Sequence, residues 1–279
     1  MIGLTIFSHS LRQVLGNLGM AVRISGWLAL VFAVLGVAMF SFMPDWFILA
    51  MQGQPVSVAD MSQISPSGMM LFLFGVIAAV VFFSWSVSLV AIAWHRFILL
   101  EEYPSGFIPY QSTFKIGRYF WVGVGISLLA ALVVGLIGGI LGLAFGPLFM
   151  NSLANATQAS SLQFIGTSFI IGLILGAIVA VIYLRMALVL PAIALNENMT
   201  IGEAWGATGG YTGAILMLAL VLAAINVVVS LLLEMVLGGN VDAWFSMAVS
   251  GLYQWFFFML NISVLSTLYG YIVQKRDIF

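Results

Sequence analysis

Charged residues and cysteine are the kinds of residue that this 279-residue sequence has least of. Only 6% of its residues are charged and 63% are hydrophobic, whereas charged residues make up about 25% of a soluble domain. A chain of this composition cannot cover itself with a water-soluble surface, so most of its surroundings must be hydrocarbon. The composition predicts a polytopic membrane protein, and we expect an all-α fold.

The same absences exclude several kinds of chemistry. With no cysteine, the chain can form no disulfide, thiolate metal site or iron–sulfur cluster. His9 and His95 are the only histidines and neither has another histidine within helical reach, so we expect no metal and no cofactor. The net charge of −1 and the scattered basic residues exclude a nucleic-acid partner.

Long intervals without charge predict six transmembrane helices, because a charged side chain at the bilayer centre is costly and one crossing needs about 20 residues. The interval between Arg118 and Arg185 is long enough for two crossings, and the polar stretch over residues 146–161 divides it. We expect a single domain, 1–279, with crossings near residues 24–44, 69–94, 120–146 and 164–190 and within 204–233 and 243–274.

The distribution of charge predicts the orientation. All eight Lys and Arg residues fall on one predicted side of the membrane, whereas Asp45, Asp60, Glu234 and Asp242 fall on the other. Basic residues in short loops favour the cytoplasmic side. We therefore expect a protein of the bacterial inner membrane with both termini in the cytoplasm.

A weak internal repeat of about 90 residues is also present. Arg96, Arg185 and Arg276 end the even-numbered helices, and amphipathic segments over 8–17, 110–119 and 200–211 precede the odd-numbered ones. This pattern predicts three two-helix units, 1–100, 101–195 and 196–279, each preceded by a short cytoplasmic interfacial helix. Any six-span protein that follows the positive-inside rule also places basic residues at this spacing, so both interpretations stay open.

Eight residues form the pattern R-x5-P-x2-A followed by E-A-W-x-x-T-x-G: Arg185, Pro191, Ala194, Glu203, Ala204, Trp205, Thr208 and Gly210. The pattern resembles the six-helix membrane domain that accompanies some bacterial glycerophosphodiester phosphodiesterases, and related stand-alone bacterial membrane proteins of unknown function. Residues 94–102 and 11–17 are similar to stretches of the stand-alone group. The resemblance implies a membrane module without enzymatic activity, because the soluble phosphodiesterase domain has no counterpart here. Gly206 and Ala207 stand where that domain usually carries a basic residue.

Two arginines at helix ends are candidate binding residues. Arg96, beside His95 and close to Glu101 and Glu102, could form a headgroup or proton site, since histidine titrates near neutrality. The alternative is that Arg96 extends to lipid phosphates while the acids are solvated. Arg185 lies six residues before Pro191 and could bind backbone groups that the proline leaves free at a kink.

Polar residues near the membrane midplane, Asn226, Gln254 and Asn261, could line a cavity for a small polar ligand, or form hydrogen bonds between helices. Small residues four apart let helices approach closely, so we expect the third and fourth crossings to form a tight centre or a face for homo-oligomer contacts. These glycines are Gly135, Gly138, Gly139, Gly142, Gly146, Gly172 and Gly176.

No phosphate loop, nucleophile elbow or zinc-binding helix motif occurs, and we expect no catalytic residue. The leading interpretation is a non-catalytic multi-pass membrane protein, an accessory or scaffold that handles lipid or stabilises a membrane complex. One alternative is a transporter or permease for a small neutral or amphiphilic solute that uses the midplane residues. A third is an intramembrane hydrolase or transferase with an acid or histidine near the membrane surface.

Overall fold

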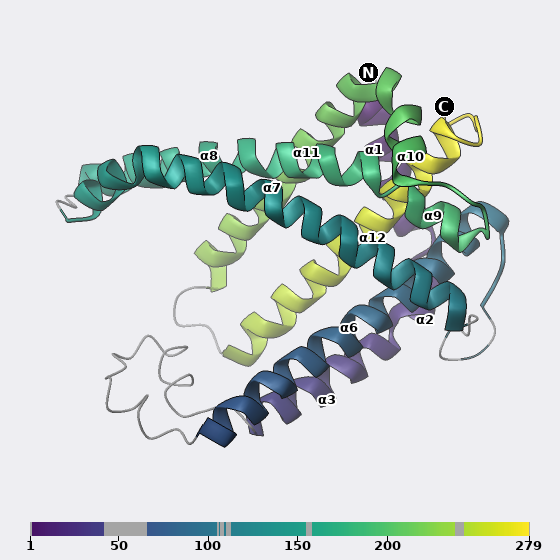
Figure 1. The fold of residues 1–279 in the computed structure, drawn as a ribbon, viewed down its shortest axis with the longest axis horizontal. Helices are drawn as coiled ribbons and strands as arrows, with labels where there is room; N and C mark the ends of the chain where they lie inside the picture. Colours follow the sequence, from purple (N-terminus) through teal and green to yellow (C-terminus); the bar gives the residue numbers. More distant parts are fainter. Residues whose placement is uncertain are drawn as a thin grey trace.

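A computed structural model describes residues 2–41, 66–104, 106, 109, 113–154, 158–237 and 243–278, and every regular element among them is a helix (Figure 1). This confirms the all-α fold. The helices are α1 (Ile2–Gly16), α2 (Leu18–Ser25), α3 (Trp27–Ser41), α6 (Pro66–Leu100), α7 (Thr113–Ala154), α8 (Gln158–Met186), α9 (Val189–Ala194), α10 (Ile201–Ala207), η1 (Gly209–Tyr211), α11 (Thr212–Leu237) and α12 (Ala243–Ile272).

Five segments of these helices are long and apolar enough to cross a membrane: Ser67–Leu100, Lys115–Ile140, Gly172–Ala194, Gly209–Leu237 and Phe245–Ile272. A sixth candidate is the pair Ile2–Gly16 and Leu18–Phe32, which is bent by 75°. The described residues therefore include five helices, or six if the bent pair is one span, that are long and apolar enough to cross a membrane. The predicted first crossing, 24–44, coincides mostly with α3, and its last three residues lie outside the described part of the chain.

Two helix boundaries differ from the expectation. The polar stretch over 146–161 does not end a helix at Gly146, because α7 continues past Pro147 to Ala154. Membrane helices tolerate such a proline when neighbouring groups satisfy the freed backbone. Between α8 and α9 the helix is interrupted, because Pro191 has no N–H for the Ala187 carbonyl and the Leu190 N–H binds that carbonyl instead, at 2.9 Å.

The predicted interfacial helices are only partly right. Residues 200–211 form the separate short helices α10 and η1, as expected. Residues 113–119 instead begin the long helix α7, because nothing in that stretch ends a helix, and residues 110–112 lie outside the described part. Residues 8–16 belong to α1, whose buried face packs on α11 and α12 and so does not lie freely on a membrane surface.

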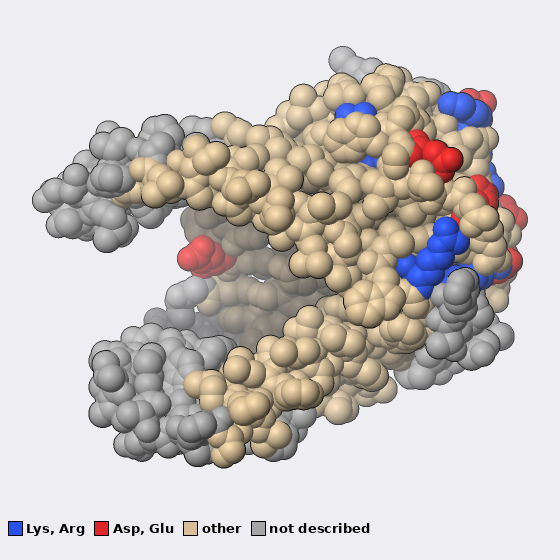
Figure 2. Space-filling model, viewed as in Figure 1, with Lys and Arg blue, Asp and Glu red and all other residues tan. Residues whose placement is uncertain are grey.

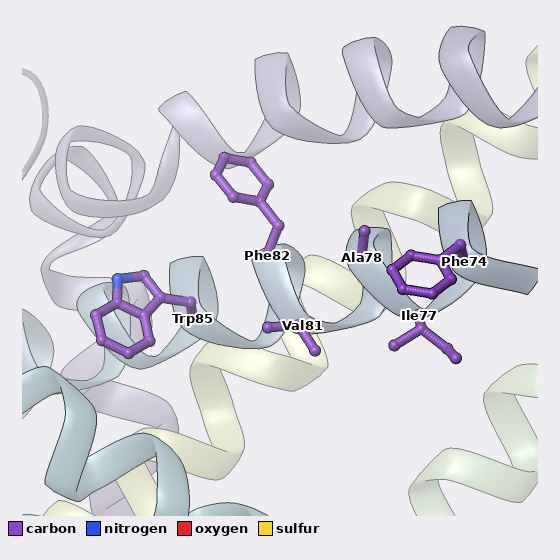
Figure 3. A pocket seen from close by; sticks show the side chains of 6 residues that line it. All are labelled: Phe74, Ile77, Ala78, Val81, Phe82 and Trp85. Carbon is purple, nitrogen blue, oxygen red and sulfur yellow. The ribbon is translucent and has the colours of Figure 1, made fainter. Parts of the chain in front are cut away.

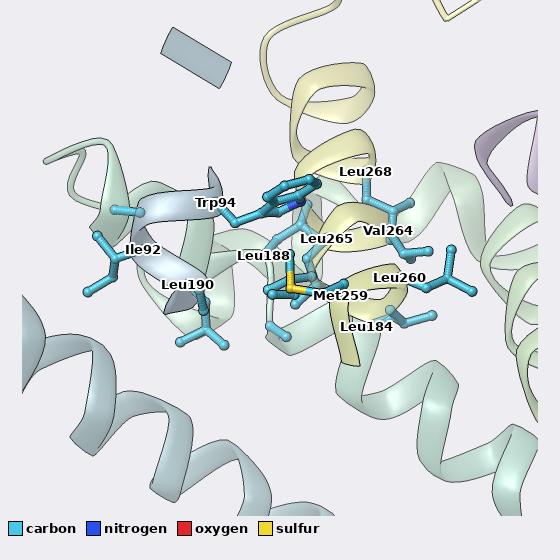
Figure 4. Packing of buried hydrophobic residues seen from close by; sticks show 14 of the residues in the cluster. Ile92, Trp94, Leu184, Leu188, Leu190, Met259, Leu260, Val264, Leu265 and Leu268 are labelled. Atoms are coloured by element: carbon cyan, nitrogen blue, oxygen red, sulfur yellow. The ribbon is translucent and has the colours of Figure 1, made fainter. Parts of the chain in front are cut away.

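The hydrophobic core lies at one end of the molecule (Figure 4). There α6, α8, α9 and α12 pack around a cluster that includes Trp94, Leu184, Leu188, Leu190, Met259, Leu260, Val264, Leu265 and Leu268. Only the C-terminal parts of α6 and α12 belong to this core, because the first buried residue is Ser86 in α6 and Met259 in α12. Beyond these points the helices separate (Figure 1).

The packed end also carries the basic residues, most of the described acidic residues and both ends of the described chain (Figures 1 and 2). We call it the charged end, defined by Arg96, Arg185 and Arg276, and we call the opposite end, toward which α6 and α7 diverge, the open end. Figure 2 shows a hollow between the two groups of helices at the open end, whose visible walls are mostly uncharged, with one acidic patch at its edge. The helices thus pack together at the charged end and diverge at the open end.

Candidate functional site

Arg96 lies four residues before the end of α6 and uses all three guanidinium nitrogens in hydrogen bonds. Its Nε and Nη2 donate to the two carboxylate oxygens of Glu102 at 2.7 and 2.6 Å, and its Nη1 donates to the Ala194 carbonyl at 2.8 Å. Only 14% of the arginine side chain is exposed. Such a bidentate pair is a strong charge-assisted contact. Glu102 is therefore not simply solvated, and Arg96 binds within the protein and not only toward lipid phosphates.

Arg276 makes the matching contact after α12. Its Nη2 donates to the Leu99 carbonyl at 2.7 Å, one residue before the end of α6. Close by, the Tyr269 hydroxyl donates to the carboxylate of Glu197. These contacts join the ends of α6, α9 and α12, which meet through Leu99, Ala192 and Tyr269.

Arg185 binds α10 and not the backbone near Pro191. Its Nε donates to the Thr208 hydroxyl at 3.1 Å and its Nη2 to the Trp205 carbonyl at 3.0 Å. The guanidinium carbon lies 3.9 Å from the centre of the Trp205 ring, which is a cation–π contact. The predicted proline-kink role is therefore wrong, because the short helix α10 folds back over Arg185 and offers it a nearer acceptor.

We call Arg96, Arg185 and Arg276, with the three carbonyls that they bind, the arginine junction. The last carbonyls of a helix have no N–H partner within that helix, and a cation near them is favourable. Each arginine supplies such a donor to a helix other than its own. The junction holds the charged end together, which leaves these side chains little capacity for a soluble substrate.

Three helices end at the junction in the same backbone conformation. Glu101, Asn196 and Lys275 follow α6, α9 and α12 and have φ of 57°, 64° and 57°. A residue with positive φ after a helix lets later N–H groups turn back to the last carbonyls. The N–H groups of Glu102, Glu197 and Arg276 do so. These three residues are 95 and 79 positions apart, whereas the arginines of the sequence repeat are 89 and 91 apart, and the repeat itself stays a prediction.

A buried polar chain crosses the core next to the junction. His95 is fully buried, with Nδ1 at 2.8 Å from the Ser266 hydroxyl and Nε2 at 3.1 Å from the Tyr119 hydroxyl. Because Ser266 donates to the Ile262 carbonyl, its oxygen accepts from His95 Nδ1–H, and Nε2 of the neutral ring then accepts from Tyr119. His95 therefore cannot reach a headgroup, and the chain links α6, α7 and α12.

Sequence reasoning missed the partners of this chain. A signal was present in the helix over 243–272, where Ser263, Ser266 and Thr267 follow one another at helical spacing on one face. Ser263 accepts from the Trp94 indole at 2.7 Å, and Thr267 accepts from Ser10 at 2.9 Å. A polar stripe in an apolar helix therefore marks the surface where α1 and α6 pack on α12.

The three midplane residues do not form one site. Asn226 accepts a hydrogen bond from Tyr253 at 3.0 Å, which joins α11 to α12. Asn261 donates to the Phe257 carbonyl of its own helix at 2.7 Å, and Gln254 is exposed. In the described part of the chain no hydrogen bond connects any two of them. The transporter alternative therefore has no assembled polar site at these positions.

The glycines of α7 and α8 do not form a tight centre. A Cβ atom added at Gly135, Gly139, Gly142 or Gly172 would meet nothing within 4 Å, and one at Gly176 would meet only Ala223 at 3.8 Å. The close helix approach is at Gly3 instead, where an added Cβ would lie 2.4 Å from the Ala214 carbonyl oxygen. The alternative, a face for homo-oligomer contacts, stays a prediction.

A capping box begins α10. The Thr200 hydroxyl accepts from the Glu203 N–H at 3.2 Å, and the Glu203 carboxylate accepts from the Thr200 N–H at 2.7 Å. These bonds from the backbone and hydroxyl of Thr200 lower the pKa of the Glu203 carboxyl below its usual value of 4.5. The box positions Trp205 and Thr208 for Arg185, so the residues that carry the family resemblance contact one another.

An apolar cavity lies along α6 (Figure 3). Its volume is about 380 Å³, which lies within the range of small-molecule sites. We call this cavity the α6 groove, and its lining residues are Phe74, Ile77, Ala78, Val81, Phe82 and Trp85. A groove with no charged lining residue can hold hydrocarbon and has no group that could bind an ion.

No protein-family model, curated protein or solved structure matches the chain. The resemblance to the six-helix domain of the bacterial phosphodiesterases therefore stays a prediction, and the candidate site rests on geometry alone. Among the residues described, no three His, Asp or Glu side chains lie close enough together to hold a metal ion.

Proposed function

We propose that the protein is a non-catalytic membrane protein that handles lipid as an accessory or scaffold. The observation that carries this proposal is the contrast between its two ends. The charged end is held shut by the arginine junction, whereas the apolar α6 groove is lined by residues of α6 alone in the part of the chain that the structure describes. In a bilayer such a gap must be filled by lipid chains or by another protein's helix, because it has no polar lining that would hold water.

The non-catalytic part of the proposal is supported by the buried polar chain. Ser266 and His95 are the only described serine and histidine that form a direct side-chain hydrogen bond, and both are fully buried. Nucleophilic catalysis needs a serine that a substrate can reach. The pair therefore has a structural role. His95 is too deeply buried to act as the catalytic group that the hydrolase alternative requires.

The proposed membrane orientation follows from charge. All eight basic residues are located in the charged end or the segments that lead to it. Since basic residues favour the cytoplasmic face, we propose that the charged end and both termini face the cytoplasm of a bacterial inner membrane. The uncovered glycines of α7 offer a second way to contact a partner or another copy.

Native mass spectrometry of the protein, extracted gently from its own membrane, tests this function. We expect at least one phospholipid to stay bound at collision energies that remove annular lipid and detergent. A bare monomer, with no lipid and no protein partner in any mild detergent, would contradict the proposal. A protein partner without lipid would favour the scaffold role over lipid handling.

A further inference from the structure

The first helix of the chain lies between the last two. α1 packs against both α11 and α12, whereas α11 and α12 touch each other only sparsely, although they follow one another in sequence. On the α11 side, Gly3 brings the backbone of α1 against the Ala214 carbonyl. On the α12 side, the Ser10 hydroxyl donates to the Thr267 hydroxyl at 2.9 Å, which donates to the side-chain oxygen of Gln13 at 3.1 Å. Docked in this position, α1 keeps α11 and α12 apart.

α1 is held by few large side chains. Its buried residues are Gly3, Ile6, Ser10 and Val14, of which Ile6 and Val14 alone carry a large hydrocarbon side chain. The buried hydrophobic residues of α12 are Met259, Leu260, Ile262, Val264, Leu265, Leu268, Tyr269 and Ile272. A segment with few buried apolar contacts is the kind that opens locally while the rest of a protein stays folded. We therefore expect α1 to be less stably docked than α12.

A break in the helix separates α1 from α2. Asn17 has a non-helical backbone, with φ of −126° and ψ of 31°, and the chain bends there by 75°. Beyond the break α2 is fixed again, because Ser25 is buried and accepts a hydrogen bond from the Trp255 indole at 2.7 Å. Hinges are positions of this kind, where a few residues at the end of an element absorb a change in backbone angles.

We propose that α1 detaches from α11 and α12 as one unit, turning about Asn17, while the rest of the molecule stays folded. In the docked state α1 covers Thr267, which is 3% exposed, and the backbone of α11 next to Ala214. In the detached state it uncovers both. The inference goes beyond the proposed function and does not depend on lipid, since it rests on contacts within the protein.

Cysteine labelling tests the detachment, because the chain has no native cysteine. Ser10→Cys and Ser263→Cys are a matched pair, because both serines are fully buried and each makes a hydrogen bond to a side chain of another helix. Val14→Cys places a second reporter at a fully buried position of α1. The rate of reaction with N-ethylmaleimide is measured on the full-length protein in nanodiscs and divided by the rate in the unfolded protein.

We expect the cysteine of Ser10→Cys to react about tenfold faster than that of Ser263→Cys, or faster still, because position 263 is reached only through unfolding of the whole bundle. The cysteine of Val14→Cys should react at the same rate as that of Ser10→Cys, since α1 moves as a unit. Equal rates at positions 10 and 263 would overturn the proposal. Unequal rates at positions 10 and 14 would also overturn it, because the helix would then fray and not detach.

A second change separates detachment from global unfolding. Ser266→Ala removes the hydrogen bond between Ser266 of α12 and His95 of α6, and α1 takes no part in that bond. We expect it to accelerate labelling at position 263 about fivefold, the factor that corresponds to a loss of about 1 kcal/mol. Labelling at position 10 should stay unchanged. Equal acceleration at both positions would mean that α1 detaches only when the molecule unfolds, and the proposal would be wrong.

Discussion

At Gly3 the backbone of α1 lies closer to α11 than any side chain would permit. A methyl group added there would lie 2.4 Å from the Ala214 carbonyl oxygen and 3.2 Å from the Leu218 nitrogen. Both neighbours are backbone atoms and cannot move aside alone. We expect Gly3→Ala to lower the free energy of unfolding by about 1–3 kcal/mol, as overpacking does, measured by thermal unfolding in detergent. Gly16→Ala, with open space at the same helix's other end, should leave stability equal or higher; equal loss in both variants would contradict the close approach.

His95 depends on two hydroxyl groups for its hydrogen bonds. Ser266→Ala leaves Nδ1 without an acceptor in a fully buried position. An unpaired buried group costs about 1–3 kcal/mol, and hydrogen bonds between membrane helices average about 0.6 kcal/mol, so we expect a loss of about 1 kcal/mol. Ser84→Ala is the control, because the Ser84 hydroxyl binds only the Val80 carbonyl of its own helix. Urea or detergent denaturation of both variants measures the difference in unfolding free energy. Equal stability of the two variants would show that the hydrogen bond between His95 and Ser266 contributes nothing to stability.

At the level of the helices, Arg276, which follows α12, binds the last turn of α6 at the charged end. Arg276→Met retains most of the apolar stem and removes the donor to the Leu99 carbonyl. We expect a loss of about 1–3 kcal/mol in unfolding free energy, since a buried acceptor then lacks its partner. Lys275→Met removes the adjacent charge without touching that carbonyl and should have a smaller effect. If Lys275→Met were the more destabilising change, net charge and not the carbonyl contact would hold the helix ends together.

The short helix α10 should respond to acid through its capping box. The folded-state pKa of Glu203 lies below its usual value of 4.5, so the carboxylate stabilises the helix above pH 4.5 and the stabilisation is lost as the pH falls through the folded-state value. Hydrogen exchange of the α10 amides should therefore accelerate at low pH. Glu203→Gln should remove most of this dependence on pH, and an unchanged profile in that variant would assign the acid response to another group.

Which helices the chain forms could be predicted from sequence, whereas which groups they bind could not. Long uncharged intervals show where hydrocarbon must be crossed. Of the three arginines expected at helix ends, Arg185 lies in the last turn of α8, whereas Arg96 lies four residues before the end of α6 and Arg276 four residues after α12. Their acceptors are backbone carbonyls of other helices, and every residue has a carbonyl, so no side-chain pattern identifies them. The spacing of the α7 glycines did not predict helix packing for a related reason. Small residues four apart allow another helix to approach closely, but they do not show that another helix lies there.

Taken as one molecule, the protein has its stability at the charged end and its uncovered apolar surface at the open end. The absence of cysteine allows spin labels to be placed at two introduced cysteines without background. Leu71 of α6 and Leu143 of α7 are exposed toward the open end, whereas Leu100 and Ile201 are exposed at the charged end. Each pair reports the distance between helices at its own end.

Removal of lipid should change only the open-end distance. If lipid chains fill the gap, the α6 and α7 labels will move closer or broaden their distances in delipidated detergent, because apolar walls close on an empty space that water does not fill. The charged-end pair should keep its distance, since the arginine junction and the buried polar chain do not involve lipid. Double electron–electron resonance in nanodiscs and in detergent measures both pairs. An equal change at both ends would mean that the whole bundle loosens and that lipid acts as solvent and not as a ligand.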